Sequence, residues 1–314
     1  VEDKDFDLEF HVRHIRLPEP GDWRQLCIQV ARLHSRPLDM TKAPWELTVI
    51  EGLDAIEGLP SGSYAVVTKI HHACIDGVAG ADITEALHSL EPYGALPRPP
   101  ETPWRGEDEP NPVELVTRAQ FNNFTQPLKF AEVMARAIPA MANFQAGLAQ
   151  RKFTVNTPVP KTRFGRVISS HRIIEGRTIE LAKVKNVKRA VEGATINDAV
   201  LTICGGALRK YLLSKKELPD HSLVAMAPIS VRSNGDSGQE GNSVAAMTVA
   251  LGTDIEDPIE RLESVHIAAI SSKEMTNAVG AKLMTDFGQF IPSTTAALAS
   301  RLYSEVSMAE QITH

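Results

Sequence analysis

The segment from Tyr64 to Gly77 constrains the fold of this chain most, because it joins a strand pattern to a group of reactive side chains. Residues 64–70 read Tyr-Ala-Val-Val-Thr-Lys-Ile, an alternating, β-branched run that predicts a half-buried strand. The next seven residues read His-His-Ala-Cys-Ile-Asp-Gly. The glycine permits a sharp backbone turn, and a neutral imidazole at a strand end can accept a proton from a hydroxyl near neutral pH. The pattern therefore predicts a strand that ends at an acid–base site.

The two histidines carry different expectations. Adjacent residues on a strand point to opposite faces, so the two imidazoles are not expected to reach one substrate atom. We take His72 as the candidate general base and His71 as structural. The alternative for His72 is a core histidine satisfied by hydrogen bonds.

Cys74 is expected to pack as a small apolar side chain, because an acyl-carrying thiolate needs a base and an oxyanion site. Zinc is not expected, because helical zinc motifs place two histidines four residues apart and these are adjacent.

Composition limits the class of protein. Of the 314 residues, 43% are hydrophobic and 23% are charged, which is ordinary for a globular chain with room for two lobes. The formal net charge of −6 argues against a nucleic-acid partner. Cys27, Cys74 and Cys204 stand far apart without metal-type spacing, which favours a reducing cytoplasm. No run approaches the roughly 18 consecutive apolar residues of a membrane-spanning helix, so none is expected.

The periodicity of apolar residues predicts strands interleaved with helices, and hence an α/β architecture. Helices are predicted at Trp23–His34, Gly80–Leu90, Leu181–Ala190, Pro258–Met275, and from an N-cap at Thr195 through Tyr211. Strands are predicted at Glu46–Leu53, Tyr64–Ile70, His171–Ile174, Thr178–Leu181, Leu223–Pro228 and Ser243–Leu251.

A proline-rich stretch at residues 92–112 divides the chain, because proline removes backbone donors and prevents regular structure. We expect a first lobe with the histidine motif at 1–91, a connector and helical segment at 92–164, and a second lobe at 165–314 that is incomplete at its C-terminus. Within the middle segment, Pro139 is expected to kink or break the helix. The apolar stretch 130–148 either meets lipid or packs on the protein's own core.

Further blocks accompany the His-His-x-x-x-Asp-Gly motif in a fixed order. They are Pro37-Leu-Asp39, Ala43-Pro-Trp-Glu46, Val49-Ile-Glu-Gly-Leu53, Ile196-Asn-Asp-Ala-Val-Leu201, Cys204-Gly-Gly-Ala-Leu-Arg209, Pro228-Ile-Ser-Val-Arg232, Gly241-Asn242, Thr253-Asp254 and Asp257-Pro258. In this order the chain resembles the bacterial wax ester synthase/diacylglycerol acyltransferases of the CoA-dependent acyltransferase superfamily, over roughly residues 5–270. The match departs at Ala43-Pro44-Trp45, where that family usually has Pro-Leu-Trp.

The resemblance implies a fold and an activity. The implied fold is two chloramphenicol-acetyltransferase-like α/β lobes with mixed sheets, joined by the proline-rich connector, with a catalytic channel between them. Members of the family continue on both sides, so the chain looks truncated at both ends. The implied reaction moves a fatty acyl group directly from acyl-CoA to a long-chain alcohol or to diacylglycerol, with His72 as general base. It needs acyl-CoA as co-substrate but no metal or other cofactor, and it fits a cytoplasmic protein, with the inner membrane face or lipid droplets as possible docking places.

The resemblance also implies roles for supporting residues. Asp76 pairs with Arg232 and holds the motif loop, which turns at Gly77. Asn197 and Asp198 either cap a helix or help to position the substrate or the loop. The basic residues Lys183, Lys185, Lys188 and Arg189 either meet the phosphates of CoA or, as we prefer, form a solvated face. Two rival functions stay open, a condensation domain acting between carrier proteins and a non-catalytic lipid- or acyl-binding module.

Overall fold

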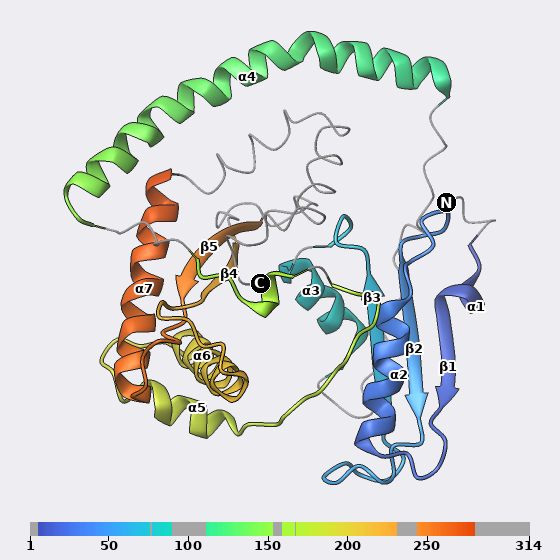
Figure 1. Ribbon diagram of the computed structural model, residues 1–314. Helices are drawn as coiled ribbons and strands as arrows, with labels where there is room; N and C mark the ends of the chain where they lie inside the picture. The colour runs from blue at the N-terminus through green and yellow to red at the C-terminus, as the bar shows by residue number, and fades with distance from the viewer. Residues whose placement is uncertain are drawn as a thin grey trace. The chain divides into compact units, whose positions relative to one another are not determined.

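The computed structural model describes residues 6–75, 77–89, 111–152, 159–166, 168–230 and 244–279. It is a mixed α/β chain with two small sheets that divides into two compact units (Figure 1). The first unit holds the described residues up to Arg118 together with Ser169–Arg177, and the second holds the rest. Each unit is described by itself.

A three-stranded sheet forms the first unit. Its strands are β1 (Val12–Arg16), β2 (Trp45–Glu51) and β3 (Ala65–Ile70), in the order β1-β2-β3. β1 runs parallel to β2, and β3 runs antiparallel to it, with Glu46 opposite Lys69 and Ile50 opposite Ala65. The short helix α1 (Leu8–His11) precedes β1, and α3 (Gly77–Leu87) follows β3. The predicted strands at Glu46–Leu53 and Tyr64–Ile70 are therefore both present, with slightly shorter bounds.

Helix α2 (Trp23–Ser35) covers one face of this sheet. It begins where Asp22 and Gln25 form a capping box, which satisfies backbone donors of the first turn. Its apolar side chains join Leu17, Ile50 and Leu53 in a buried core. Since Ile50 is fully buried, this core fixes which face of β2 and β3 points inward, and so fixes the direction in which β3 leads into the histidine motif.

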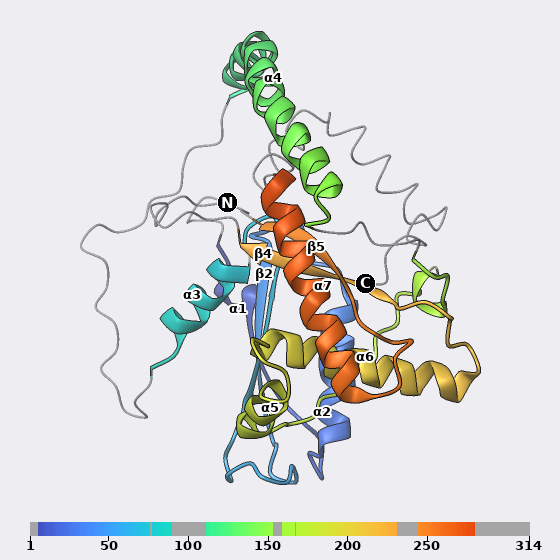
Figure 2. The same cartoon turned by 90° about the vertical axis from the view of Figure 1, so that its left-hand side faces the viewer.

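The second unit pairs β4 (Val224–Ser230) with β5 (Val244–Ala250) in an antiparallel ladder. Helix α7 (Pro258–Val279) packs against β5, α6 (Ile196–Lys215) packs against α7, and α5 (Leu181–Lys188) packs against α6 (Figure 2). One buried cluster joins Leu212 of α6 to Leu223 and Leu251, and another joins Met247 and Val249 of β5 to Val265 of α7. A 3-10 turn, η2 (Arg163–Gly165), precedes them in the sequence. The predicted helices and strands of residues 195–275 are confirmed, with α6 and α7 each one turn longer than expected.

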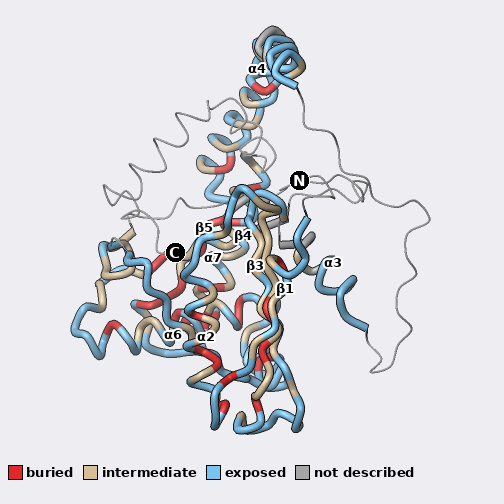
Figure 3. The backbone as a smooth tube through the Cα atoms, turned by 90° about the vertical axis from the view of Figure 1, so that its right-hand side faces the viewer, coloured by how far each residue is buried: buried red, intermediate tan, exposed pale blue. Residues whose placement is uncertain are grey.

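Helix α4 runs without interruption from Pro112 to Ala149, and the boundary between the units falls inside it after Arg118. Both Pro127 and Pro139 lie inside the helix, so of the kink or break expected at Pro139 the break does not occur. Most of its described side chains are exposed, as the tube in Figure 3 shows, although Val133 is buried. The connector 92–112 lies outside the described residues except for its last two.

The predicted strands His171–Ile174 and Thr178–Leu181 are wrong. Residues 168–180 form neither helix nor strand, and Leu181 begins α5. Side chains bind some of the backbone groups of this segment. Arg172 Nη1 donates to Ser169 O at 2.7 Å and to His171 O at 2.9 Å, and Gly176 N–H donates to the Glu175 carboxylate at 3.0 Å. A β-like composition therefore gives an extended segment without strand partners.

Candidate functional site

The histidine motif lies where β3 ends. The His71 N–H donates to Pro44 O at 2.9 Å, which extends the pairing with the β2 side one residue beyond Ile70. The chain then turns, with Cys74 N–H donating to His71 O at 2.9 Å, and α3 begins at Gly77. The predicted arrangement of strand, turn and helix is present.

The imidazole of His71 is held by its own turn. Its Nδ1 lies 3.2 Å from the Ala73 N–H, so this nitrogen acts as an acceptor and a neutral ring carries its proton on Nε2. The side chain of His72 is exposed. His71 and His72 both lie after the end of β3. The alternation of side chains along a strand therefore does not apply to them and cannot show that they face opposite ways. The assignment of His72 as the base and His71 as structural stays a prediction.

Of the other residues expected at the motif, the structure describes Cys74 and Gly77 but not Asp76 or Arg232. Asp76 and Arg232 lie outside the described residues, so their pairing stays a prediction. Gly77 is the first residue of α3, whereas the turn itself is formed by residues 72–74, so the sharp turn expected at this glycine stays a prediction. Cys74 is exposed, which corrects the expectation that it packs as a small apolar side chain.

Lys69 anchors the strand end from which the motif emerges. Its Nζ donates to Leu33 O at 3.2 Å and also to Arg36 O, two carbonyls at the C-terminal end of α2. The half-buried Glu46 lies opposite it on β2 and makes a 3.5 Å ion pair with Arg13. The sequence analysis did not single out Lys69. A signal was available, because Lys69 stands two residues after Val67 and so shares the strand face that packs against α2.

Trp45 belongs to the scaffold of the first unit. Its indole stacks on the buried ring of His11 with centroids 4.7 Å apart, and its carbonyl oxygen lies 2.7 Å from His11 Nδ1. The His11 ring also stacks on Phe6 at 5.0 Å. The start of β2 is thereby fixed beside the residues that pair with His71.

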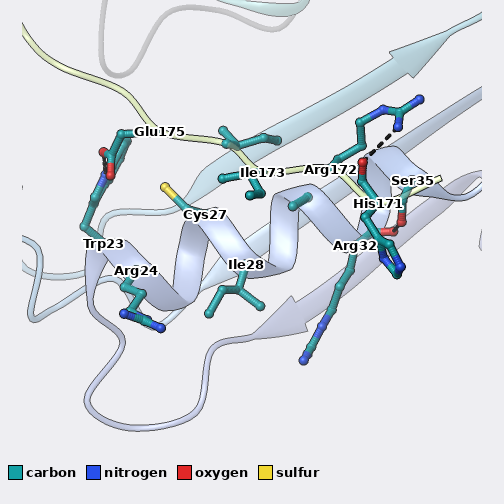
Figure 4. A pocket seen from close by; sticks show the side chains of 12 residues that line it. Trp23, Arg24, Cys27, Ile28, Arg32, Ser35, His171, Arg172, Ile173 and Glu175 are labelled. Carbon is teal, nitrogen blue, oxygen red and sulfur yellow. Dashed lines mark hydrogen bonds between the residues drawn. The ribbon is translucent and has the colours of Figure 1, made fainter. Parts of the chain in front are cut away.

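Two cavities flank the extended segment 171–175 of the first unit. One, of about 480 Å³, lies between this segment and α2 (Figure 4). There the Trp23 indole N–H donates to the Glu175 carboxylate at 2.7 Å. This bond, with help from the Gly176 N–H, lowers the pKa of Glu175. Burial raises the pKa of the Cys27 thiol, and the nearby carboxylate of Glu175 raises it further.

The other cavity, of about 420 Å³, opens on the sheet side of the same segment. Glu46, Thr48, Val67 and Lys69 of the sheet are among its lining residues. It reaches Lys69, two residues before His71, so it is the described cavity that comes closest in sequence to the candidate base. Its lining is mixed, because apolar side chains stand beside Glu46, Lys69 and Arg172, and such a lining suits part of an amphiphilic substrate.

The Asn197-Asp198 pair opens helix α6. Thr195 is the N-cap, as predicted, and it forms a capping box with Asp198, whose carboxylate accepts the Thr195 N–H at 2.8 Å. Asp198 is buried and also accepts a hydrogen bond from His266 Nδ1 at 2.9 Å. Asn197 is exposed. The structure thus gives Asp198 a capping and tethering role, while the role of Asn197 toward a substrate stays a prediction. His266 was missed by the sequence reading.

The basic residues around α5 are largely solvated. Lys183, Lys185 and Arg189 are exposed and Lys188 is half-exposed, and Lys183 forms a 3.2 Å ion pair with Glu180. These exposures fit the solvated-face interpretation. In the part of the chain that the structure describes, no group of three or more His, Cys, Asp or Glu side chains could hold a metal ion. None of the described helices combines the length and apolar character needed to cross a membrane.

The fold resembles a solved structure of known class. Over 98% of this chain and 61% of the other, it is similar to the wax ester synthase/diacylglycerol acyltransferase from Marinobacter aquaeolei VT8, with a TM-score of 0.61 and 24% sequence identity. At that identity the likeness establishes the fold class alone.

Sequence comparison identifies the family. Residues 1–200 match the wax ester synthase/diacylglycerol acyltransferase catalytic domain, and residues 240–310 match the C-terminal domain of the same proteins. The chain belongs to the wax ester synthase/diacylglycerol acyltransferase family. This confirms the resemblance drawn from the sequence blocks.

Relatives in two genera illustrate this membership. The chain is 32% identical over 281 residues to a probable diacylglycerol O-acyltransferase of Mycobacterium tuberculosis and to the O-acyltransferase WSD of Acinetobacter baylyi. Each match covers 87% of this chain and 58% of the relative. The chain therefore spans a little under three-fifths of the length of these curated relatives.

Proposed function

We propose that this chain catalyses O-acyl transfer from a fatty acyl-CoA to a long-chain alcohol, giving a wax ester, or to diacylglycerol, giving triacylglycerol. The observation that carries the proposal is the match of residues 1–200 to the family's catalytic domain, a span that includes the histidine motif at the end of β3. The names of the relatives, diacylglycerol O-acyltransferase and O-acyltransferase, support the same reaction class.

In the proposed mechanism His72 is the general base. The hydroxyl oxygen of the acceptor attacks the thioester carbonyl while its proton passes to the imidazole. The tetrahedral intermediate then collapses, the C–S bond breaks, and the imidazolium returns the proton to the departing CoA thiolate. A positioned base of this kind contributes about 10²–10⁴-fold. The exposure of His72 supports the role, because the ring is accessible to a substrate. Acyl-CoA is the co-substrate, and the step needs no metal or other cofactor.

Supporting residues hold the motif in this proposal. Asp76 and Arg232 form a bidentate ion pair that stiffens the loop before Gly77. Asp76→Ala and Arg232→Ala are then expected to lower turnover to a similar extent, with the double variant little worse than either, because both remove one interaction. Additive losses would argue that the two side chains do not meet. Asn197 is proposed to position the substrate or the loop, and Asp198 to hold the helix that carries it.

The wider organisation is also a proposal. We assign residues 1–91 and 165–314 to two chloramphenicol-acetyltransferase-like lobes and residues 92–164 to the connector and helical segment between them in sequence. Helix α4 presents exposed apolar side chains within residues 130–148, among them Met134, Ile138 and Met141. They support contact with a lipid surface, such as the inner membrane face or a lipid droplet.

The direct test supplies a fatty acyl-CoA with hexadecanol or with diolein and identifies the lipid product by chromatography and mass spectrometry. We expect ester formation that needs both substrates and is lost in a folded His72→Ala variant. Hydrolysis of acyl-CoA without ester product would point to a thioesterase. Binding of acyl-CoA without turnover would favour a non-catalytic acyl-binding module. Transfer that occurs only between carrier-protein thioesters would favour the condensation-type alternative.

A further inference from the structure

A cavity of about 890 Å³ lies in the second unit, on the faces of α5, α6 and α7. These helices lie side by side in both views (Figures 1 and 2). Its walls are mainly apolar, and four charged side chains also line it. The described lining residues are Val187, Thr202, Ile203, Gly206, Ala207, Arg209, Lys210, Leu213, Glu256, Pro258 and Arg261. None of them belongs to the histidine motif.

Arg261 is a buried cation with one donor group unused. Its side chain lies in α7, and the residue is only 7% exposed. Nε donates to Gly252 O and Ile255 O, each at 3.2 Å, and Nη2 donates to Ile255 O at 2.7 Å and Glu256 O at 2.9 Å. Among the described residues, Nη1 has no hydrogen-bond acceptor. Because a buried donor on a charged group is costly to leave unpaired, this nitrogen is a place for an acceptor from outside the chain.

Gly206 places that nitrogen at the cavity wall. A Cβ atom at position 206 would lie 2.8 Å from Arg261 Nη1, so the glycine lets the guanidinium approach the backbone of α6. Gly206 and Arg261 both line the cavity, and Lys210 stands one helical turn after Gly206 on the same face. The unused Nη1 and the Lys210 ammonium are therefore the donors that a ligand in this cavity would meet.

The cavity also carries an excess of positive charge. Arg209, Lys210 and Arg261 are balanced by one carboxylate, Glu256, which is 93% exposed and lies 3.7 Å from Arg209 Nη2. Because the Glu256 side chain is solvated and the contact is long, the pair is weak. Arg209 Nη1 is already used, donating to Thr253 O at 2.9 Å and Asp254 O at 3.1 Å. Burial lowers the pKa of Arg261 and the neighbouring Arg209 lowers it further, while the carboxylate of Asp257 acts in the opposite direction without outweighing them.

We propose that this cavity binds a phosphate monoester carried on an apolar body, with the phosphate between Arg261 Nη1 and Lys210. The body lies against Val187, Ile203 and Leu213. A phosphate monoester carries about −1.5 to −2 charges at neutral pH and can accept from both the Arg261 guanidinium and the Lys210 ammonium, whereas a carboxylate supplies a single charge. Such a group occurs on phosphatidate-type lipids and on the ribose of CoA. The argument does not depend on acyl transfer, so the site can be tested apart from the reaction.

Isothermal titration of the 314-residue chain tests the ligand chemistry, with octyl phosphate as the probe. We expect octyl phosphate to bind about tenfold or more tightly than either inorganic phosphate or octanoate, because only it supplies both the apolar body and the double charge. Titration with dihexanoylphosphatidate and with CoA then distinguishes a lipid phosphate from the ribose phosphate of CoA. The compound that binds more tightly identifies the ligand class that the cavity suits. Equal affinity for octanoate and octyl phosphate would overturn the assignment to phosphate.

Lys210→Glu and Lys185→Glu form a matched pair that locates the binding. Both lysines are exposed and both variants make the same change of charge, but only Lys210 lines the cavity. We expect Lys210→Glu to weaken octyl phosphate binding about tenfold or more and Lys185→Glu to change it by about twofold or less, because charge-assisted contacts act at short range. Equal losses in the two variants would show a non-specific charge effect and overturn the proposal.

Gly206→Ala tests the role of Arg261 without removing its charge. The new methyl group would displace Nη1, the far end of a flexible side chain, while alanine favours the helix. We expect weaker octyl phosphate binding with an unchanged or higher thermal unfolding midpoint. Unchanged binding in this folded variant would exclude Arg261 Nη1 as the donor. Ester formation is not measured in any of these tests, so their failure and that of the proposed acyl transfer are separate results.

Discussion

The side chain of His266 ties helix α7 to the first turn of α6, because its Nδ1 lies 2.9 Å from Asp198 Oδ2. The two side chains are 16% and 4% exposed, so the bond is largely shielded from water. The same carboxylate accepts the Thr195 N–H at 2.8 Å and closes the capping box of α6. One carboxylate thus serves both the start of a helix and the packing of its neighbour.

This arrangement predicts a pH dependence of stability. Burial by itself would raise the pKa of Asp198, but hydrogen bonds from Thr195 and His266 outweigh it and lower the pKa. A carboxyl with a lower pKa in the folded chain stabilises the fold above its unfolded value of about 4, and this contribution is lost as the pH falls through the folded value. Asp198→Asn should therefore lower the free energy of unfolding by about 1–3 kcal/mol at neutral pH.

Urea unfolding of wild type and Asp198→Asn at pH 7 and pH 3 measures this effect. We expect the difference between the two proteins to shrink at pH 3, because below about pH 4 the unfolded wild-type chain binds a proton at this carboxyl more readily than the folded chain does. A difference that stays constant across this range would show that the charge of Asp198 is not what stabilises the fold.

Gly205 and Gly206 predict a contrast between two neighbouring alanine substitutions in α6. A Cβ atom at position 205 would lie 2.2 Å from the carbonyl oxygen of Leu251, a backbone atom that cannot move alone. Gly205→Ala should therefore destabilise the chain by about 2 kcal/mol or more, through overpacking. Gly206→Ala meets only the end of the Arg261 side chain and should be neutral or stabilising. Thermal unfolding of both variants checks the contrast, and similar midpoints would contradict the close approach of the Leu251 loop to α6.

The sequence predicted best those features whose signals are local. The strand into the histidine motif, the helix that follows the motif and the Thr195 cap depend on residues a few positions apart, and all three are present. The paired glycines 205 and 206 are a further local signal, because glycine inside a helix indicates a close approach, and the Leu251 carbonyl and the Arg261 side chain do approach them closely.

Features that depend on distant partners could not be predicted in this way. Lys69 reaches carbonyls more than thirty residues earlier, and 68 positions separate Asp198 from His266. The segment around Ile173 has the composition of a strand, but a strand needs a neighbour to pair with, and composition does not say whether one is present. Neither local periodicity nor residue type carries this information.

Substitution of the motif histidines should affect activity unequally. We expect His72→Ala to abolish ester formation, because the acceptor hydroxyl loses its base, and His71→Ala to keep a measurable fraction or to fail through misfolding, because the Nδ1 of His71 accepts the Ala73 N–H within the turn. Product formation in both variants is compared after circular dichroism has shown that each is folded. Near-native turnover by a folded His72→Ala protein would remove His72 as the base.

The three cysteines should differ in their rates of alkylation. Cys27 is buried, and burial together with the Glu175 carboxylate raises the pKa of its thiol, so little of the reactive thiolate forms. Cys74 and Cys204 are exposed. Iodoacetamide should therefore add two groups rapidly to the folded chain and a third only after unfolding, as read from the intact mass. Rapid addition of a third group to the folded wild type, absent in Cys27→Ser, would show that the α2 side of the first unit opens readily.

The exposure of Cys74 makes its part in the chemistry a question that an experiment has to answer. Direct transfer requires the acyl donor and the acceptor to be bound together, so no covalent acyl-enzyme should form and Cys74→Ala should keep most activity. The described contact of Cys74 is a backbone one, its N–H donating to His71 O at 2.9 Å, which fixes the turn without involving the thiol. The protein is incubated with labelled acyl-CoA in the absence of acceptor, and its intact mass is measured, with Cys204→Ala as the matched control for the other exposed thiol. A stoichiometric adduct on the Cys74 peptide, lost together with activity in Cys74→Ala but kept in Cys204→Ala, would replace direct transfer by a cysteine-linked intermediate.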